Sequence, residues 1–367
     1  MGGVVTAPGE GHGRRPLKPT AKAVAERAGV SVTTVSRVIN NRADDISPQT
    51  RARVLKAAEF LRYRPNSLAA ALRKGRSQTV GLIVPDIGDA YFHQIARGVD
   101  DVARAAGYTM LLCNTDRDPE KERSSIRALY DRSVDAIIFA GGGVDSDRHL
   151  SDLPWDLANV VTVGPHVLPF PNIRVDDAGT IKMAMKHIFE QGCTRVLCIA
   201  GADSWLISSE RARGYREALE EEGIPYDDDL MMSGDFGLES GQAAIGRAVA
   251  AGIQFDAVMA FNDYTAAGAS SALQKSGRAI PDDVVVVGCD DIELASLVTP
   301  GLTSVGFPQY SFGTAAMNTA LDLIAGRPVE PLTTFDYRLA VRESSLKMPA
   351  VASSPDPDTK PDNEESS

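Results

Sequence analysis

From residue 78 onward, short apolar runs alternate with longer amphipathic segments, and this alternation constrains the fold more than any other feature of the chain. Strands are expected at 79–85, 108–113, 134–140, 159–163, 195–200, 229–233, 256–261 and 283–288. Helices are expected at 91–106, 119–132, 177–191, 210–222, 239–251, 263–276 and 308–325. Apolar strands alternating with helices are typical of parallel sheets covered on both faces. Two similar blocks meet near 164–176, which predicts two lobes.

The segment that precedes this alternation has a different pattern, with three short helical stretches. Each begins at a hydroxyl residue suited to cap a helix, namely Thr20, Ser31 and Ser47. A glycine turn at Gly29 joins the first stretch, TAKAVAERAGV, to the second, SVTTVSRVIN. This arrangement predicts a helix-turn-helix.

The charge of the chain is divided unevenly between its two ends. Residues 1–76 contain 15 Lys and Arg against 5 Asp and Glu, although the 367-residue chain has a net charge of −11. A basic folded end on an acidic protein indicates a polyanionic partner for that end. A basic tail that only aids solubility is the alternative, and the helical patterning of this end argues against it.

The second helical stretch has the division of side chains that a recognition helix requires. Val35 and Val38 are expected to pack inward, because they lie three residues apart on one helical face. The outward and terminal residues are Ser31, Thr33, Thr34, Ser36, Arg37 and Asn40. An ordinary amphipathic helix is the alternative for this pattern taken alone.

Residues 68–73, LAAALR, are good helix formers but too few to be stable in isolation. Leu72 lies beside the basic residues Arg73, Lys74 and Arg76. An apolar wedge between cations suits insertion into a DNA minor groove, with the cations neutralising phosphates. A linker with an incidental leucine is the alternative.

The ends of the chain and the cysteines exclude several classes of protein. Residues 1–19 and the acidic segment 349–367 are expected to be disordered. No apolar run approaches the roughly 20 residues that a membrane helix requires, and the N-terminus lacks the apolar core of a secretory signal, so a cytoplasmic protein is expected. The four cysteines show no metal-ligand spacing and are expected to be reduced.

Several stretches together resemble the LacI/GalR family of bacterial transcriptional regulators. They are AVAERAGVSVTTVSRVINN, YRPNSLAAALRKGRS, GLIVPDIGDAYF, LLCNTDRDPEKE, RARGYREALEEEGI and FNDYTAAGA with VVVVGCDDI. The resemblance runs from about residue 20 to residue 347. It implies an all-α helix-turn-helix domain at 20–64, a hinge helix and linker at 65–77, and a two-lobed core at 78–348 like that of periplasmic binding proteins. We expect the first lobe to comprise 78–163 and 291–306, and the second 176–290 and 307–348.

The resemblance further implies a homodimer on a palindromic operator, with the hinge helices in the central minor groove. It places Leu72 at the intercalating position and Val32 and Thr33 at positions that set operator preference. Ala70 departs from the polar or basic residue common there, so one backbone contact is in doubt. The expected DNA-contacting residues are Ser31, Val32, Thr33, Thr34, Ser36, Arg37, Asn40, Ala69, Leu72 and Arg73.

Ligands of open parallel sheets bind beyond the carboxyl ends of the strands, so residues after strand ends are candidates for a binding site. Polar groups that hold vicinal hydroxyls, beside aromatic rings that stack on a sugar face, favour a carbohydrate effector. The expected effector residues are Asp86, Tyr91, Phe92, Trp205, Arg211, Phe236, Asn262 and Asp290. The resemblance aligns Arg211, Asn262 and Asp290 with effector-contacting residues of the family. Helix caps and core packing are the alternatives for single members of this set, for example for Asp263, Asp291 and the phenylalanines.

Two departures narrow the class of effector that the resemblance implies. Gly164 and Pro165 stand where some members have an aspartate, so one hydroxyl contact is in doubt. Trp205 and Ile207 differ from the members that bind nucleobases, which argues against a purine.

Two other functions are consistent with parts of the sequence. A solute-binding protein with a basic extension would share the two lobes, but no secretory signal is present. A dinucleotide-dependent enzyme would share the alternating pattern, but no GxGxxG motif or catalytic constellation is found. We therefore expect no enzyme, no cofactor and no metal, and a regulator, specifically a repressor, controlled by a small molecule.

Overall fold

The computed structural model describes residues 19–39, 45–64, 76–141, 143–151, 153 and 159–347. The chain forms two compact units, residues 1–77 and residues 78–367, which are described separately. The predicted tails and most of the predicted hinge, residues 65–75, lie outside the described residues.

The first unit contains the three predicted helices, α1 (Ala21–Ala28), α2 (Val32–Ile39) and α3 (Pro48–Phe60). The Thr20 hydroxyl accepts a hydrogen bond from the Ala23 amide at 3.2 Å, and Ser47 caps α3 in the same way. Gly29 ends α1 with a φ of 64°, a left-handed conformation that costs glycine little. Val35 and Val38 are buried against α1 and α3, so their predicted inward orientation is confirmed.

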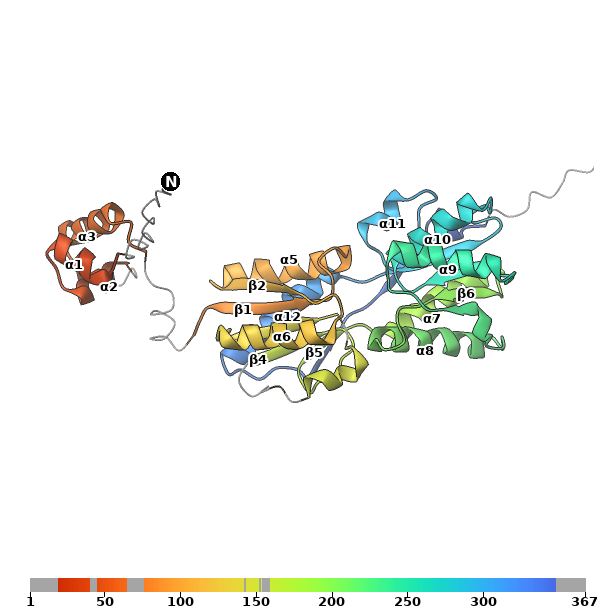
Figure 1. Ribbon diagram of the computed structural model, residues 1–367, viewed down its shortest axis with the longest axis horizontal. Helices are drawn as coiled ribbons and strands as arrows, with labels where there is room; N and C mark the ends of the chain where they lie inside the picture. Colours follow the sequence, from red (N-terminus) through yellow and green to blue (C-terminus); the bar gives the residue numbers. More distant parts are fainter. Residues whose placement is uncertain are drawn as a thin grey trace, which may run out of the picture. The chain divides into compact units, whose positions relative to one another are not determined.

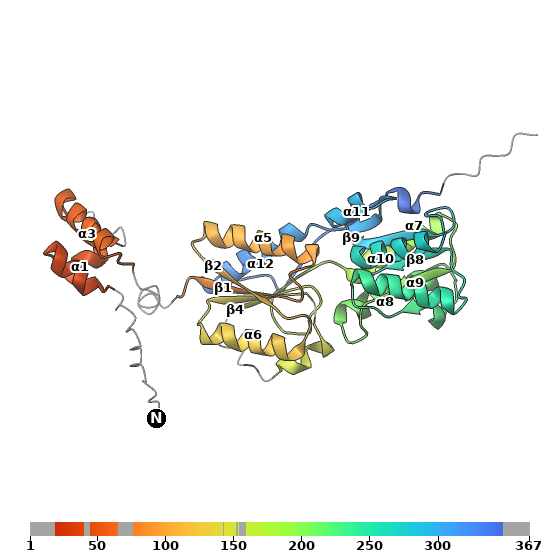
Figure 2. The same cartoon turned by 45° about the horizontal axis from the view of Figure 1, so that its top comes forward.

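The second unit begins with a six-stranded sheet in the order β11–β5–β4–β3–β1–β2, in which all neighbours are parallel. Its strands are β1 (Thr79–Val84), β2 (Thr109–Asn114), β3 (Ala136–Ala140), β4 (Asn159–Val163), β5 (Asn172–Arg174) and β11 (Leu332–Thr334). Helices α5 (Ala90–Ala105) and α12 (Gln309–Ile324) cover one face, and α6 (Pro119–Asp131) covers the other (Figure 1; Figure 2).

A second sheet has the order β12–β10–β9–β8–β6–β7, and only β12 is antiparallel to its neighbour. Its strands are β6 (Val196–Ile199), β7 (Met231–Met232), β8 (Ala257–Ala260), β9 (Val285–Asp290), β10 (Thr303–Gly306) and β12 (Arg338–Ala340). Alternate residues of β6 face opposite layers, because side chains alternate along a strand. One layer is formed by α7 (Asp177–Glu190) and α8 (Leu206–Glu221), the other by α9 (Leu238–Ala250) and α10 (Asp263–Lys275).

The two-lobed, mainly parallel architecture agrees with the predicted fold class, but the predicted allocation of the last segments was wrong. Residues 291–306 were assigned to the first lobe, yet β10 pairs with β9 in the second sheet. Residues 307–348 were assigned to the second lobe, yet α12 packs on α5 and β11 pairs with β5 in the first. Only β12 returns to the second sheet. Strands of three or four residues carry too little pattern to reveal their partners.

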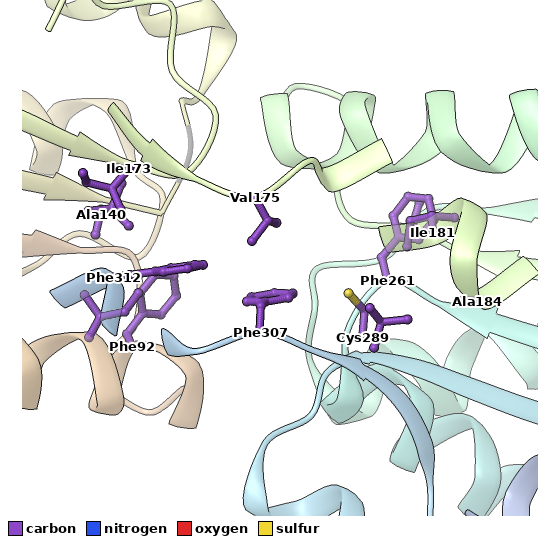
Figure 3. Packing of buried hydrophobic residues seen from close by; sticks show 14 of the residues in the cluster. Phe92, Ala140, Ile173, Val175, Ile181, Ala184, Phe261, Cys289, Phe307 and Phe312 are labelled. Atoms are coloured by element: carbon purple, nitrogen blue, oxygen red, sulfur yellow. The ribbon is translucent and has the colours of Figure 1, made fainter. Parts of the chain in front are cut away.

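The segments that connect the lobes are buried in a hydrophobic cluster that extends into both lobes. Val175 and Phe307 belong to two of these connections and lie between the lobes (Figure 3). The Phe307 ring stacks on Phe312 of the first lobe at a centroid distance of 5.7 Å. Phe261 of the second lobe belongs to the same cluster. The lobes therefore share apolar packing at their junction.

Candidate functional site

A pocket lies between the two lobes, at the carboxyl ends of the strands. Six residues expected at an effector site line it, namely Tyr91, Phe92, Arg211, Phe236, Asn262 and Asp290. They come from both lobes, because Tyr91 and Phe92 belong to α5 and the other four to the second lobe. The fold thus brings together residues that are up to about 200 positions apart in the chain, as parallel strands ending at one edge allow.

Arg211 is the charged centre of this pocket. Its side chain is 5% exposed and lies between two buried carboxylates. Nε donates to Asp177 at 3.4 Å and Nη2 donates to Asp290 at 3.1 Å, while Nη1 donates to the Phe261 carbonyl oxygen. A planar guanidinium with its donors fixed in this way is oriented before any ligand arrives.

Burial changes the titration of the aspartates beside Arg211. Burial raises the pKa of Asp290 to about 7, and the positive charge of Arg211 opposes this rise. Burial also raises the pKa of Asp177 above its ordinary value, again against Arg211. Asp290 is therefore a carboxyl group that can change its protonation state near neutral pH.

Because of this shift, we expect the free energy of unfolding of the core to decrease as the pH rises through about 7. A carboxyl whose pKa is raised on folding contributes stability that is fully present below its unfolded pKa, 3.8, and is lost above its folded pKa. Asp290→Asn should remove this contribution and flatten the pH profile by on the order of 1 kcal/mol per pH unit between pH 5 and 7. Urea unfolding of both proteins at several pH values measures this, and parallel profiles would contradict it.

Asn262 and Asp263 follow the same strand but have different surroundings. Asn262 lines the pocket, and its side-chain oxygen also caps α10 by accepting from the Thr265 amide at 3.0 Å. Asp263 is fully buried away from the pocket and accepts from the Ile292 amide at 2.8 Å and the Ser304 hydroxyl at 2.6 Å. The cap is thus provided by Asn262, and Asp263 joins α10 to β10 within the second lobe.

Two residues expected at the pocket do not line it. The Asp86 side chain is exposed and accepts from the Gly88 amide at 2.7 Å. It follows β1 as expected, but the turn directs its carboxylate back onto its own backbone. Trp205 does not line the pocket but contacts Phe236, which does, with ring centroids 5.4 Å apart.

Four charged pocket residues were absent from the prediction: Asp89, Arg117, Arg174 and Asp177. The rule of searching beyond strand ends could have found Arg117, which follows β2. Arg174 ends a strand of three residues, which was too short to recognise. Asp177 is the first residue of α7 and resembles an ordinary helix-terminal acid in sequence.

The predicted recognition helix, α2, exposes part of the surface expected to contact DNA. Ser31, Val32, Thr33 and Arg37 are exposed, and Thr34 and Ser36 are half-buried. Val32 is 47% exposed, so its side chain is accessible for a contact. The Ser31 oxygen accepts from the Thr34 amide at 3.1 Å, and Arg37 forms an ion pair with Asp45. The remaining expected contacts, Asn40, Ala69, Leu72 and Arg73, lie outside the described residues.

The part of the chain that the structure describes has neither a cluster of metal-binding side chains nor a membrane-spanning helix. Among its residues no three His, Cys, Asp or Glu side chains are grouped so as to hold a metal ion. In the same ranges, no helix has both the length and the apolar character needed to cross a membrane. The histidines that the structure describes contact Ile87, Glu122, Asp147 and Ser345, and none of them lines the pocket.

The fold and the pocket define a class of protein in which a two-lobed ligand-binding core shares one chain with a helix-turn-helix domain. Residues 77–329 match the family model described as periplasmic binding proteins and sugar binding domain of LacI family. Residues 20–66 match the model for bacterial regulatory proteins, lacI family. The chain belongs to the LacI family of transcriptional regulators, as the resemblance implied.

Named relatives agree with this membership. The HTH-type transcriptional regulator DegA of Bacillus subtilis is 36% identical over 83% of this chain and 91% of its own length. The ribose operon repressor of Halalkalibacterium halodurans is 34% identical over 89% of this chain and 97% of its own. A solved complex of the transcriptional regulator CelR with cellobiose is 32% identical, covers 89% of this chain and all of its own, and has a TM-score of 0.68. These relatives are regulators of transcription, which favours the predicted regulator over a solute-binding protein.

Proposed function

We propose that this chain is a transcriptional repressor that binds a palindromic operator as a homodimer and is controlled by a carbohydrate in the pocket between its lobes. The observation that carries the proposal is the position of Arg211, held between two buried aspartates and beside aromatic rings in a chain that also has a helix-turn-helix domain. Such a site offers fixed donors and acceptors to hydroxyl groups and a flat apolar surface to a sugar ring.

The carbohydrate class is supported by the residues that line the pocket and by the relatives. Three arginines and three aspartates line the pocket together with Tyr91, Phe92, Phe236, Phe307 and Phe312. One relative is named as the repressor of a ribose operon, and another was solved in complex with cellobiose. Both sugars carry the hydroxyl groups that such polar side chains can hold. The proposal includes no catalytic step and no cofactor, and it places the protein in the cytosol, where operator DNA lies.

In the proposed mechanism, binding of effector in the pocket and binding of operator DNA are thermodynamically coupled, so that each changes the affinity for the other. A ligand that binds one arrangement of the lobes better than another shifts the population of the two. The linker at 65–77 joins the helix-turn-helix unit to the lobes, so their arrangement is expected to act on DNA binding through this linker.

The proposal is tested by a thermal-shift screen of the full chain against a panel of sugars, with and without operator DNA selected from a random pool. We expect one sugar to raise the midpoint temperature of thermal unfolding. Operator DNA should change the size of that rise, because a sugar that alters the affinity for DNA must have its own affinity altered by DNA. A panel in which every sugar behaves alike, or a selection that yields no preferred sequence, would contradict the proposal.

Leu72→Ala is expected to weaken binding to the selected operator by about tenfold, or roughly 1.4 kcal/mol, and to leave binding to random DNA nearly unchanged. The reason is that a wedge in the minor groove stabilises only the kinked, specific complex, whereas Arg73 and Lys74 contact phosphates in any sequence. Gel-shift titrations with both DNAs measure the two affinities, and Leu297→Ala, at a leucine of the core that is 70% exposed, is the matched control. Equal losses on both DNAs would argue against the wedge.

A further inference from the structure

Backbone contacts join the two lobes beside the pocket, outside its lining. The amide of Leu206 in the second lobe donates to the Gly143 carbonyl oxygen of the first at 3.0 Å. The neighbouring residues Val144 and Trp205 form an antiparallel bridge, and Val144 is 3% exposed. None of these four residues lines the pocket. The lobes are thus held together here by contacts that a bound ligand would not replace.

The contact completes the first turn of α8. Helix N-termini leave amides without intrahelical partners, and a capping side chain usually satisfies one of them. Trp205 occupies the N-cap position of α8 and makes no side-chain cap bond. The Leu206 amide is instead satisfied by Gly143 from the opposite lobe. Separating the lobes therefore leaves the start of α8, the helix that carries Arg211, without this partner.

The first-lobe side of the contact is the short helix η1 (Asp145–Leu150) with the two residues before it, and side chains fix it to that lobe. The His149 ring contacts the Glu122 carboxylate of α6 at 2.6 Å. Asp147 accepts from the Val167 amide at 2.9 Å and contacts the His166 ring at 3.3 Å. Both histidine–carboxylate pairs are largely buried. The segment is thus a fixed part of the first lobe.

A side chain crosses between the lobes at the same place. Arg117, which follows β2 in the first lobe, places its guanidinium 4.5 Å from the centre of the Trp205 ring and 5.4 Å from that of Phe236. Its Nη1 donates to the Gly141 carbonyl oxygen at 2.9 Å. The attraction of a cation to two aromatic faces of the second lobe adds to the backbone contacts.

We propose that residues 143–150 form a clasp that holds the lobes together and sets the balance between two lobe arrangements in the absence of effector. The clasp stabilises one arrangement, and none of its residues lines the pocket, although its partner Trp205 contacts the pocket residues Phe236 and Arg117. The clasp therefore changes the fraction of protein molecules whose lobes are in the arrangement that binds effector, and this fraction sets the apparent affinity for effector. This inference rests on the proposed function only where it predicts a change in operator binding.

The first test locks the clasp in the full chain by the double substitution V144C with W205C. Residues opposite each other in an antiparallel bridge are close enough for a disulfide. We expect mild oxidation to form the bond without any sugar, as shown by mass spectrometry of the linked peptides. Operator affinity should then differ by about fivefold or more between the oxidised and the reduced protein. Each single cysteine variant is the control and should respond to oxidation much less.

The second test opens the clasp with Val144→Asp, which buries a charge at the contact. Trp205 reports on the result in a Trp155→Phe background, because these are the only two tryptophans of the chain. We expect its emission to shift to longer wavelength, and operator affinity to change by about fivefold or more in the direction opposite to that of the lock. Val167→Asp is the matched control, since Val167 lies on the neighbouring loop and is 59% exposed.

The outcomes of these tests distinguish a failure of the clasp proposal from a failure of the proposed function. A linked peptide that does not form, or an emission spectrum unchanged by Val144→Asp, would overturn the clasp itself. A disulfide that forms without altering operator affinity would show that the contact does not control DNA binding, and would also overturn the inference. A reduced protein that binds no selected DNA would instead contradict the proposed function.

Discussion

Replacing Arg211 with alanine is expected to abolish the response of operator binding to effector, while the unliganded protein still binds DNA. The guanidinium donates to Asp177, Asp290 and a backbone carbonyl in a site that is 5% exposed. Its removal takes away the fixed donors of the pocket, leaves Asp290 without its ion-pair partner and leaves Asp177 with only the more distant Arg174 at 3.8 Å. Removing one partner of a buried ion pair costs about 3–5 kcal/mol, so the core should also become less stable by about this amount.

Operator titrations with and without the sugar found in the thermal-shift screen measure the response, and urea unfolding measures the stability. Arg213→Ala is the matched control on the same helix, because Arg213 is half-exposed and pairs with Glu210 and Glu217 at the surface. We expect it to respond to effector normally and to lose about 1 kcal/mol or less. An Arg211→Ala protein that still responds would remove Arg211 from the site.

Gly313→Ala is expected to destabilise the first lobe by about 3 kcal/mol, whereas the same substitution at Gly246 should stabilise the second lobe by up to about 1 kcal/mol. A Cβ at Gly313 of α12 would lie 2.1 Å from the Ile95 carbonyl oxygen of α5. The backbone of α5 cannot rotate away as a side chain can, so the two helices would have to separate. A Cβ at Gly246 of α9 meets no atom within 4 Å, and alanine there reduces the entropy of the unfolded chain.

Chemical denaturation of the two variants measures these opposite signs. The comparison is informative because, in each closely packed helix pair of the core, a glycine of one helix lies against the backbone of the other. Gly214 of α8 approaches the Ala178 carbonyl, and Gly268 of α10 approaches that of Leu238. Destabilisation of similar size at Gly246 and Gly313 would show that helix propensity, rather than the approach of backbones, determines the effect.

Much of the fold could be predicted because its signals are local. The predicted helix at 177–191 corresponds to α7 at Asp177–Glu190, and the caps Thr20 and Ser47 were identified from residue type alone. The start of α8 was predicted at residue 210, yet the helix begins at Leu206. The N-cap position is occupied by Trp205, whose side chain cannot cap a helix, and the Leu206 amide donates instead to the Gly143 carbonyl oxygen of the other lobe. The error arose where a local structure depends on a distant partner.

In the candidate pocket, too, some features could be predicted from the local sequence and others depend on residues far apart in the chain. Arg211, Asn262 and Asp290 were expected because each follows a strand, or opens the helix after one, in a parallel sheet. Asp86 satisfied the same rule but is turned away, while Asp177 was overlooked and lies against Arg211. Position after a strand determines which end of the sheet a residue reaches. The direction of its side chain depends on the turn and on its neighbours.

The sequence by itself determined the kinds and order of the longer elements and the presence of a basic helical domain before an acidic α/β core. Periodicity, caps and charge are properties of neighbouring residues, and they act before the chain is compact. The tertiary structure alone decided which lobe receives 303–306 and 309–334, which charges surround Arg211 and where the lobes touch. These outcomes depend on contacts between residues far apart in the chain, whose free energies exist only once both partners have been brought together.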